Sequence, residues 1–142
     1  MSQTNKQLVA DALRALSAGD VDGCVVLHHP DYVNHEAAFG QLRGGDAVRN
    51  TVAFLHGTFE DLRIEPLDLI AENDLVAVRA QFSGRQVGTV DGFAASGRAC
   101  SVQHVHIYRI TDGRISEHWA CRDDLGAARQ MGLLPDPDKA PA

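Results

Sequence analysis

The chain has 142 residues, of which 44% are apolar and 23% charged, and this composition excludes an intrinsically disordered protein. Thirteen basic against nineteen acidic residues give a formal charge of −6 without any cluster of Lys and Arg, so nucleic acid is excluded as a partner. Because the sequence contains no signal peptide core, no run of about twenty apolar residues and no CxxC pair, we expect a cytoplasmic protein with no membrane partner.

Apolar residues recur at helical spacing in three places within the first 60 residues. The first pattern predicts a helix over residues 6–17, which Gly19 ends. Asp20 can cap a short second helix that stops before Pro30, and a third helix is expected to end at Gly57. The residues that carry these three patterns are Val9, Ala12, Leu13 and Leu16, then Val21, Cys24 and Val25, then Val48, Thr51, Val52 and Leu55.

The rest of the chain changes to the two-residue repeat of half-buried strands. We predict strands over residues 62–70 and 75–84, joined by a turn at residues 72–74. Because proline is confined to edge strands and bulges, Pro66 indicates that part of the first strand is an edge or a bulge. A long hairpin follows, over residues 98–110 and 115–121. Helices followed by strands indicate an α+β fold with an antiparallel sheet.

Four segments together resemble a known family: residues 29–34 (HPDYVN), 105–115 (VHIYRITDGRI), 117–119 (EHW) and 124–132 (DLGAARQMG). They resemble the SnoaL-like polyketide cyclases of the NTF2-like superfamily. The resemblance implies one domain over residues 1–142, with loose termini at 1–5 and 133–142. It also implies an NTF2-like cone, in which three N-terminal helices pack on a curved antiparallel sheet.

In that family an Asp on the last strand is the acid/base of a cofactor-free intramolecular aldol closure, and a His with neighbouring polar groups supports it. The resemblance assigns supporting roles to His106, His104 and Asn34. The position of the catalytic Asp is occupied here by Ala120. We therefore expect Asp123, the nearest carboxylate, to take over the acid/base role together with His106.

Asp123 and Asp124 also stand where a helix begins, and one of them is expected to cap it. The other would then be free to enter the cavity. The cap and the acid/base role are thus competing interpretations of the same pair of aspartates.

His104, His106 and Tyr108 lie two residues apart on one predicted strand, so their side chains share a face. The length of the hairpin loop decides which residues of the next strand join them. We favour a three-residue loop, residues 111–113, which places His106 on the same face as His118. A two-residue loop, 112–113, would place it with Trp119 instead.

The predicted substrate-binding residues surround this face. Asn34 and His35 stand at the entry of the expected cavity, and Trp119 is assigned to the pocket, the core or a subunit interface. His-x-His could also bind a first-row metal, but two histidines at this spacing are weak evidence and we predict neither a metal nor a cofactor. The full predicted set is His106 and Asp123 as catalytic residues, with His104, Asn34, His35, His118, Tyr108 and Trp119 as substrate-binding residues.

Together with this set, the resemblance implies cofactor-free cyclase or isomerase chemistry, in the class of lyases and isomerases, on a hydrophobic, polyketide-like small molecule. A homodimer is expected to cover the sheet face that carries Val105 and Ile107. Two alternatives remain open at this point: a non-catalytic small-molecule binding module, and an epoxide or ester hydrolase in which Asp123 and His106 position a water.

Overall fold

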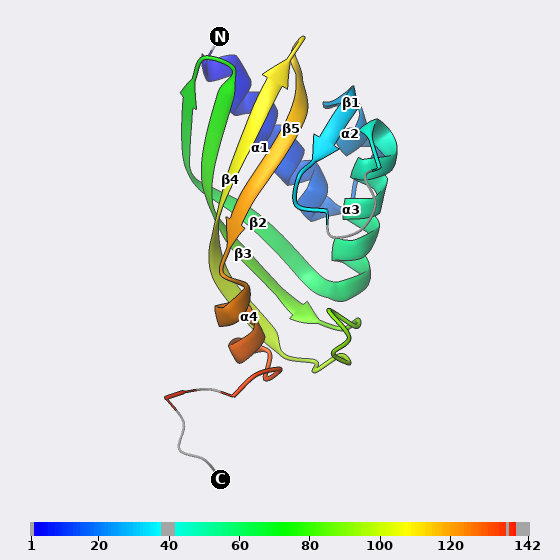
Figure 1. The fold of residues 1–142 in the computed structure, drawn as a ribbon, viewed down its shortest axis with the longest axis vertical. Coiled ribbons are helices and arrows are strands. Elements are labelled where there is room, and N and C mark those ends of the chain that lie inside the picture. The colour runs from blue at the N-terminus through cyan, green and yellow to red at the C-terminus, as the bar shows by residue number, and fades with distance from the viewer. Residues whose placement is uncertain (1, 38–41, 136, 139–142) are drawn as a thin grey trace.

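Five strands form one curved sheet in the computed structural model, which describes residues 2–37, 42–135 and 137–138 (Figure 1). The strand order is β1-β5-β4-β3-β2, so the last two strands of the chain lie in the middle of the sheet beside β1. All neighbouring pairs are antiparallel except β1 and β5, which are parallel. The strands are β1 (His28–Asn34), β2 (Phe59–Glu72), β3 (Leu75–Gln86), β4 (Ala99–Thr111) and β5 (Arg114–Arg122).

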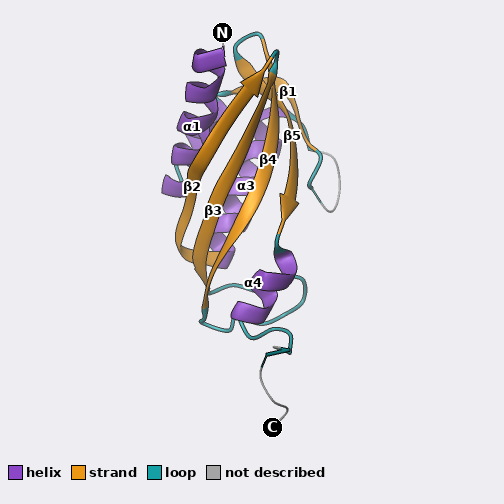
Figure 2. Cartoon of the chain, turned by 90° about the vertical axis from the view of Figure 1, so that its left-hand side faces the viewer, coloured by secondary structure: helices purple, strands orange, loops and turns teal. Residues whose placement is uncertain are grey.

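Three helices precede the main strands, as predicted: α1 (Ser2–Ala18), α2 (Val21–Val25) and α3 (Gly44–Thr58). α1 and α3 cover one face of the sheet, which we call the inner face, and α2 packs against these two helices (Figure 2). The α+β cone is confirmed, with one addition: a fourth helix, α4 (Asp124–Gln130), follows β5 where only a closing turn was expected. Among the helices of the described residues, none is long and apolar enough to cross a membrane.

The predicted limits of two helices need correction. α1 begins at Ser2, so residues 2–5 are helical and do not form a loose terminus. Their polar side chains carry no apolar repeat that would have revealed this. α3 continues through Gly57 to Thr58 because β2 follows without a loop. Residues 133–135 and 137–138 lie outside helices and strands, and residues 1, 136 and 139–142 lie outside the described part.

β1 was not predicted as a strand, because Pro30 was interpreted as the end of a helix. Its residues pair in parallel with β5, with Val33 opposite Glu117 and Asn34 opposite His118. Tyr32 is buried and Pro30 is exposed, which is compatible with a proline on the edge strand of a sheet. The sheet is therefore mixed, and its only parallel pair among the described strands brings Asn34 to the inner face.

The β4–β5 hairpin has a two-residue loop, so the predicted three-residue loop is wrong. Asp112 and Gly113 both have positive φ, 52° and 73°, and Thr111 pairs with Arg114. A bulge at Ser116 then shifts the pairing by one residue. Beyond the bulge His106 lies opposite Ala120, the same face that the longer loop predicted.

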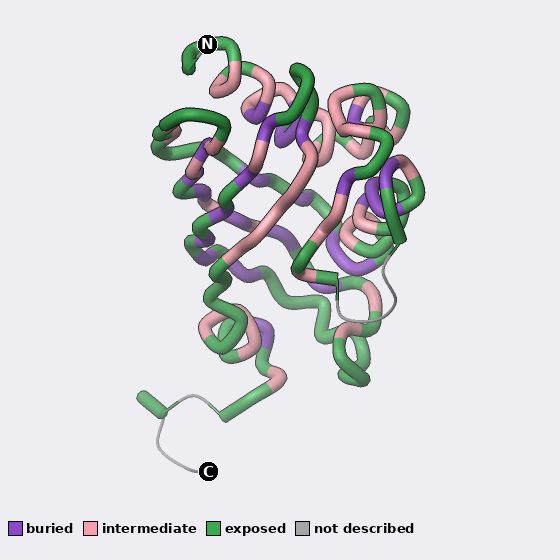
Figure 3. The backbone as a smooth tube through the Cα atoms, turned by 45° about the horizontal axis from the view of Figure 1, so that its top comes forward, coloured by how far each residue is buried: buried purple, intermediate pink, exposed green. Residues whose placement is uncertain are grey.

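Burial alternates along β3 and β4, as Figure 3 shows by the change of colour from residue to residue. Every second residue from Cys100 to Ile110 is buried on the inner face. This alternation confirms that His104, His106 and Tyr108 share the inner face.

Candidate functional site

Three histidines and one tyrosine gather on the inner face of β4 and β5. His104 and His106 are only 7% and 8% exposed, and Tyr108 is also buried. The Tyr108 ring stacks on that of His118 with 4.9 Å between centroids, while His104 stacks on Phe82 at 4.9 Å. The predicted residues of β4 are thus brought together with His118 of β5.

Hydrogen bonds connect His106 to His118 and His118 to Asn34, and we call these three residues the inner network. The distance from His106 Nδ1 to His118 Nε2 is 2.9 Å, and that from His118 Nδ1 to Asn34 Oδ1 is also 2.9 Å. Asn34 Oδ1 also accepts the backbone N–H of Glu36 at 3.0 Å, and its amide donates to Thr51 Oγ1 at 3.4 Å. The network therefore joins β4, β5, β1 and α3.

His106 Nε2 is buried and has no hydrogen-bond partner within residues 2–37, 42–135 and 137–138. Leaving a buried polar atom unpaired costs about 1–3 kcal/mol, so such atoms are uncommon in folded proteins. A ligand that supplied the missing partner would recover this energy. His106 Nε2 is therefore the atom of the inner network at which a ligand would form a new hydrogen bond.

Burial keeps the inner network neutral. Desolvation, with smaller contributions from His104 and Arg122, lowers the pKa of His106 to about 4. Desolvation and the neighbouring His106 lower the pKa of His118 to about 3. The pKa of His104 is also lowered, chiefly by desolvation. Near pH 7 these imidazoles are uncharged, and each has one donor and one acceptor nitrogen.

A cavity of about 50 Å³ lies between the helices and the sheet on the Asn34 side of His118. It has room for water molecules but not for a polycyclic ligand, so side chains must move to admit one. Asn34 and His118 of the inner network are among the described residues that line it, whereas His106 is not. Residues that line it include Cys24, His28, Tyr32, Asn34, Tyr108 and His118.

Asp123 lies outside the inner network. Its carboxylate is the N-cap of α4 and accepts the backbone N–H of Gly126 at 2.8 Å, and the residue is exposed. Of the two interpretations of the aspartate pair, the structure places Asp123 in the capping position. The reason is that the chain leaves the sheet after Arg122, so the next residue turns toward the first amides of the helix.

His35 and Trp119 were predicted as substrate-binding residues, but the structure does not place them on the inner face with His106. Trp119 lies opposite Ile107 on the outer face of the sheet, because it follows His118 by one residue on the strand. The His35 ring stacks on it at 4.8 Å, and His35 Nε2 lies 3.0 Å from Glu117 Oε2. Both residues belong to the outer face, as the alternative of a core or interface Trp119 allowed.

The donor set does not favour the metal alternative for the histidine pair. Both ring nitrogens of His118 are already engaged, one with His106 and the other with Asn34. A shared metal ligand would need one of these lone pairs.

Sequence reasoning found Asn34 on β1 but missed Tyr32 and His28 on the same strand and Thr51 on α3. Tyr32 and His28 line the cavity, and Thr51 accepts the Asn34 amide while its hydroxyl donates to the Ala47 carbonyl at 3.1 Å. The period-two order of His28, Tyr32 and Asn34 was an available signal. It was obscured because Pro30 lies in the same segment.

Comparisons with known proteins show the family of this chain. A family model described as SnoaL-like polyketide cyclase matches residues 7–131. The chain is 33% identical over 122 residues to the aklanonic acid methyl ester cyclase AcmA of Streptomyces galilaeus, covering 84% of this chain and 85% of that protein. It is 32% identical over 120 residues to the nogalonic acid methyl ester cyclase of Streptomyces nogalater, covering 83% and 90%.

Among solved structures, TsrD from Streptomyces laurentii superimposes with a TM-score of 0.86. That protein is 36% identical, and the match covers 94% of this chain and 98% of TsrD. The similarity therefore extends over the helices and the whole sheet.

Proposed function

This chain belongs to the SnoaL-like polyketide cyclase family, and on that premise we propose that it closes a ring in a polyketide ester by cofactor-free aldol chemistry. The cyclases named above act, as their names state, on the methyl esters of aklanonic acid and nogalonic acid. A hydrophobic ester of this kind is the proposed substrate class.

The buried, unpaired Nε2 of His106 is the observation that carries this proposal. In the reaction it takes a proton from a carbon next to a carbonyl group. The resulting enolate attacks a ketone carbon of the same molecule, a C–C bond forms, and the alkoxide recovers the proton from Nε2. Substrate and product have the same atoms and the same oxidation state, so the step needs no oxidant or reductant.

The test is turnover of the two named methyl esters by the purified protein, followed by chromatography with mass detection. We expect a product of unchanged mass and different retention. His106→Gln should lower kcat/KM by about 10²- to 10⁴-fold, which is the usual contribution of a general base. A variant with full turnover would refute the role of His106.

Asp123→Asn is the matched control, because it keeps a good N-cap residue and removes the carboxylate. We expect turnover by this variant to stay within about twofold of the unchanged protein. A loss as large as that of His106→Gln would restore Asp123 as the acid/base and contradict our assignment.

A non-catalytic binding module is the second candidate, and Ala120 opposite His106 favours it. It predicts that either ester binds without being converted. Calorimetric titration beside the turnover assay separates the two functions, since binding with no product would favour the module.

We also propose that two copies associate through the outer face of the sheet. Val105 and Ile107 are 43% and 38% exposed on β4, and Ile70 on β2 is 67% exposed. Apolar side chains on a sheet face favour a partner that covers them, and a second copy presents the same surface. Light scattering after size exclusion should give the mass of a dimer, and Val105→Glu should give that of a monomer. A monomer before substitution would contradict the dimer.

The proposed location is the cytoplasm. All three cysteines are free thiols, with Cys24 and Cys100 buried and Cys121 exposed. Free thiols suit a reducing compartment. Fractionation of expressing cells should recover the protein with cytoplasmic markers, and recovery with secreted proteins would contradict this.

A further inference from the structure

The orientation of the Asn34 amide is determined by groups outside the inner network. A backbone N–H can only donate, so the Asn34 atom that receives the Glu36 N–H at 3.0 Å is the oxygen. The contact of Asn34 Nδ2 supports the same orientation of the amide. Thr51 donates its hydroxyl hydrogen to the Ala47 carbonyl, so its oxygen accepts from Asn34 Nδ2. Asn34 therefore presents an acceptor, Oδ1, to His118.

The hydrogen positions of both histidines follow from this acceptor. His118 Nδ1 must donate to Asn34 Oδ1, so in the neutral ring His118 Nε2 has a lone pair and accepts. His106 Nδ1 then donates to His118 Nε2, and the remaining His106 nitrogen, Nε2, has the lone pair. It is this atom that is buried without a partner among the described residues.

We propose that Asn34 and His118 are positioning residues that hold His106 in its Nδ1–H tautomer, and that the ligand group received at His106 Nε2 is a hydrogen-bond donor. The donor is an enol or phenol hydroxyl, or an acidic C–H between two carbonyl groups. The catalytic part of this inference rests on the proposed cyclase function. The tautomer part rests only on the hydrogen bonds above.

Protonation of His106 Nε2 leaves the hydrogen bonds of the inner network in place. When Nε2 takes a proton, the charged His106 ring keeps its Nδ1–H bond to His118, whose acceptor is supported by Asn34. The inner network contains no carboxylate to balance the charge. The charged ring is therefore a short-lived state that returns its proton to the product alkoxide, and the same nitrogen acts first as base and then as acid.

Long-range ¹H–¹⁵N NMR of the histidine rings tests the tautomers without any substrate. We expect both His106 and His118 to be in the Nδ1–H form near pH 7. Asn34→Ala removes the acceptor, so we expect the His118 ring to lose its single tautomer and His106 to follow. A wild-type His106 in the Nε2–H form would overturn the proposal.

Two further variants separate positioning from loss of structure. Asn34→Asp keeps an oxygen acceptor at the same place, so it should retain the hydrogen on His118 Nδ1 even though a carboxylate on the inner face lowers stability. Thr51→Val removes only the 3.4 Å contact to Nδ2 and should leave both tautomers unchanged. If Asn34→Asp and Asn34→Ala gave the same mixed tautomers, the acceptor would not be what orients His118, and the proposal would fail.

In the turnover assay, Asn34→Ala should lower kcat by about tenfold or more with KM within about twofold, because a positioning residue acts on the base and not on ligand affinity. An equal loss through KM would show that Asn34 binds substrate instead. The NMR result does not depend on turnover. If His106 and His118 are both in the Nδ1–H form but neither ester is converted, the cyclase function is refuted and the positioning inference stands.

A pair of probes tests the kind of ligand group. 1-Naphthol carries a hydroxyl donor, and 1-methoxynaphthalene has the same rings without one. At equal high concentration we expect 1-naphthol to move the His106 Nε2 resonance and 1-methoxynaphthalene to leave it in place. An equal shift with both probes, or no shift with 1-naphthol, would contradict a donor-selective site.

Discussion

Each of the two faces of β4 and β5 carries a polar network that includes histidine, but the two networks are built from different chemistry. On the inner face, His106, His118 and Asn34 are joined by hydrogen bonds between neutral groups. On the outer face, Arg109 bridges Asp74 at 2.7 Å and Glu117 at 3.1 Å, and Glu117 also meets His35. We call these four residues the outer network.

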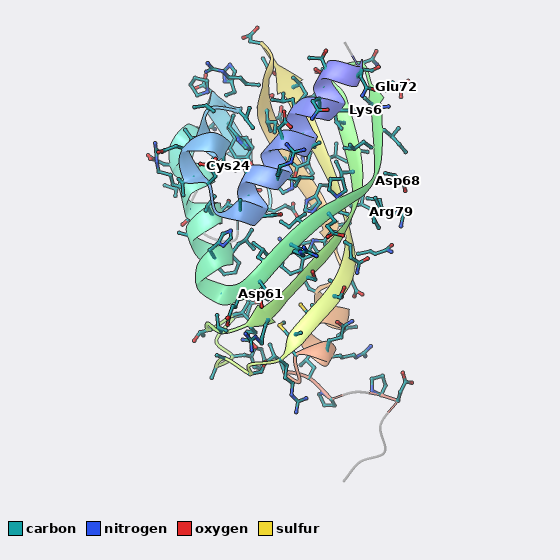
Figure 4. All side chains as sticks on the ribbon, turned by 180° about the vertical axis from the view of Figure 1, so that it is seen from behind. Lys6, Cys24, Asp61, Asp68, Glu72 and Arg79 are labelled. Atoms are coloured by element: carbon teal, nitrogen blue, oxygen red, sulfur yellow. The ribbon has the colours of Figure 1, made fainter. Side chains whose placement is uncertain are left out.

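Charges are tolerated on the outer face because water solvates them. The nearby pair of Asp68 and Arg79, labelled in Figure 4, follows the same pattern with an exposed 2.7 Å contact. Ion pairs of this kind contribute about 0–1 kcal/mol each. On the inner face a charge would lose its hydration, so the sequence places neutral donors and acceptors there, and burial holds the pKa of both histidines low. The same residue type therefore has a defined hydrogen position on the inner face and a solvated ionic partner on the outer face.

The largest effect is expected from placing a carboxylate on the inner face. Val78→Asp puts it opposite His106 at a fully buried position, and we expect a loss of about 3–5 kcal/mol in the free energy of unfolding at pH 8, where His106 is neutral and cannot compensate the charge. Gln103→Glu on the outer face, beside Arg79, is the control and should change stability by less than about 0.5 kcal/mol. Urea denaturation measures both, and equal costs would break the distinction between the faces.

The second-largest effect on stability is expected from protonating the histidines of the inner network in acid. The folded pKa values of His106 and His118 lie near 4 and 3, below the ordinary 6.5, so the unfolded chain binds more protons between these values. Stability is then complete above pH 6.5 and falls as the pH decreases toward 4, by about 1.4 kcal/mol per pH unit for each histidine. His118→Gln should give a shallower slope in urea denaturation measured from pH 7 to 4.5. An unchanged slope in this variant would show that His118 does not titrate as its burial requires.

A smaller effect is expected from removing the acceptor of the inner network. Asn34→Ala leaves the Glu36 N–H and His118 Nδ1–H without their partner, and we expect a loss of about 1–3 kcal/mol. Thermal unfolding followed by circular dichroism measures it. A change below about 0.5 kcal/mol would mean that water replaces the amide and that the network is not closed to solvent.

The smallest effect is expected on the outer network. Glu117→Gln keeps the shape of the side chain and removes its charge from Arg109 and His35, at a cost of less than about 1 kcal/mol. The loss should shrink further at 1 M salt, where exposed charges are screened. A salt-independent loss above about 2 kcal/mol would place this network among the buried ones.

Much of the fold followed from the repeat of apolar residues. The helical stripe from Val9 to Leu16 and the alternation along β3 and β4 both reappear as buried faces. β1 could not be predicted in the same way, because an edge strand with an exposed Pro30 has no clear alternation of apolar residues. β1 pairs with β5, which lies far along the chain, and a local pattern of apolar residues does not predict such a distant partner.

The candidate site was predictable in part. The spacing of His104, His106 and Tyr108 determined that they share a face, since side chains alternate along any strand. The prediction that His118 joins them is correct although the loop that motivated it is wrong, because the bulge at Ser116 compensates for the shorter turn. Bulges depend on how two strands pair, so residue spacing within one strand does not reveal them.

By itself the sequence determined the family, the α+β architecture and the residues of β4 that face inward, because these depend on local periodicity and on motifs contiguous in the chain. Only the tertiary structure decided that Asn34 meets His118, 84 positions away, that Asp123 caps α4, and that Trp119 and His35 lie on the outer face. The physical reason is that hydrogen-bond partners and burial are set by how strands pair across the sheet. Whether a histidine becomes a neutral base or a solvated partner of a carboxylate is decided by the face on which that pairing leaves it.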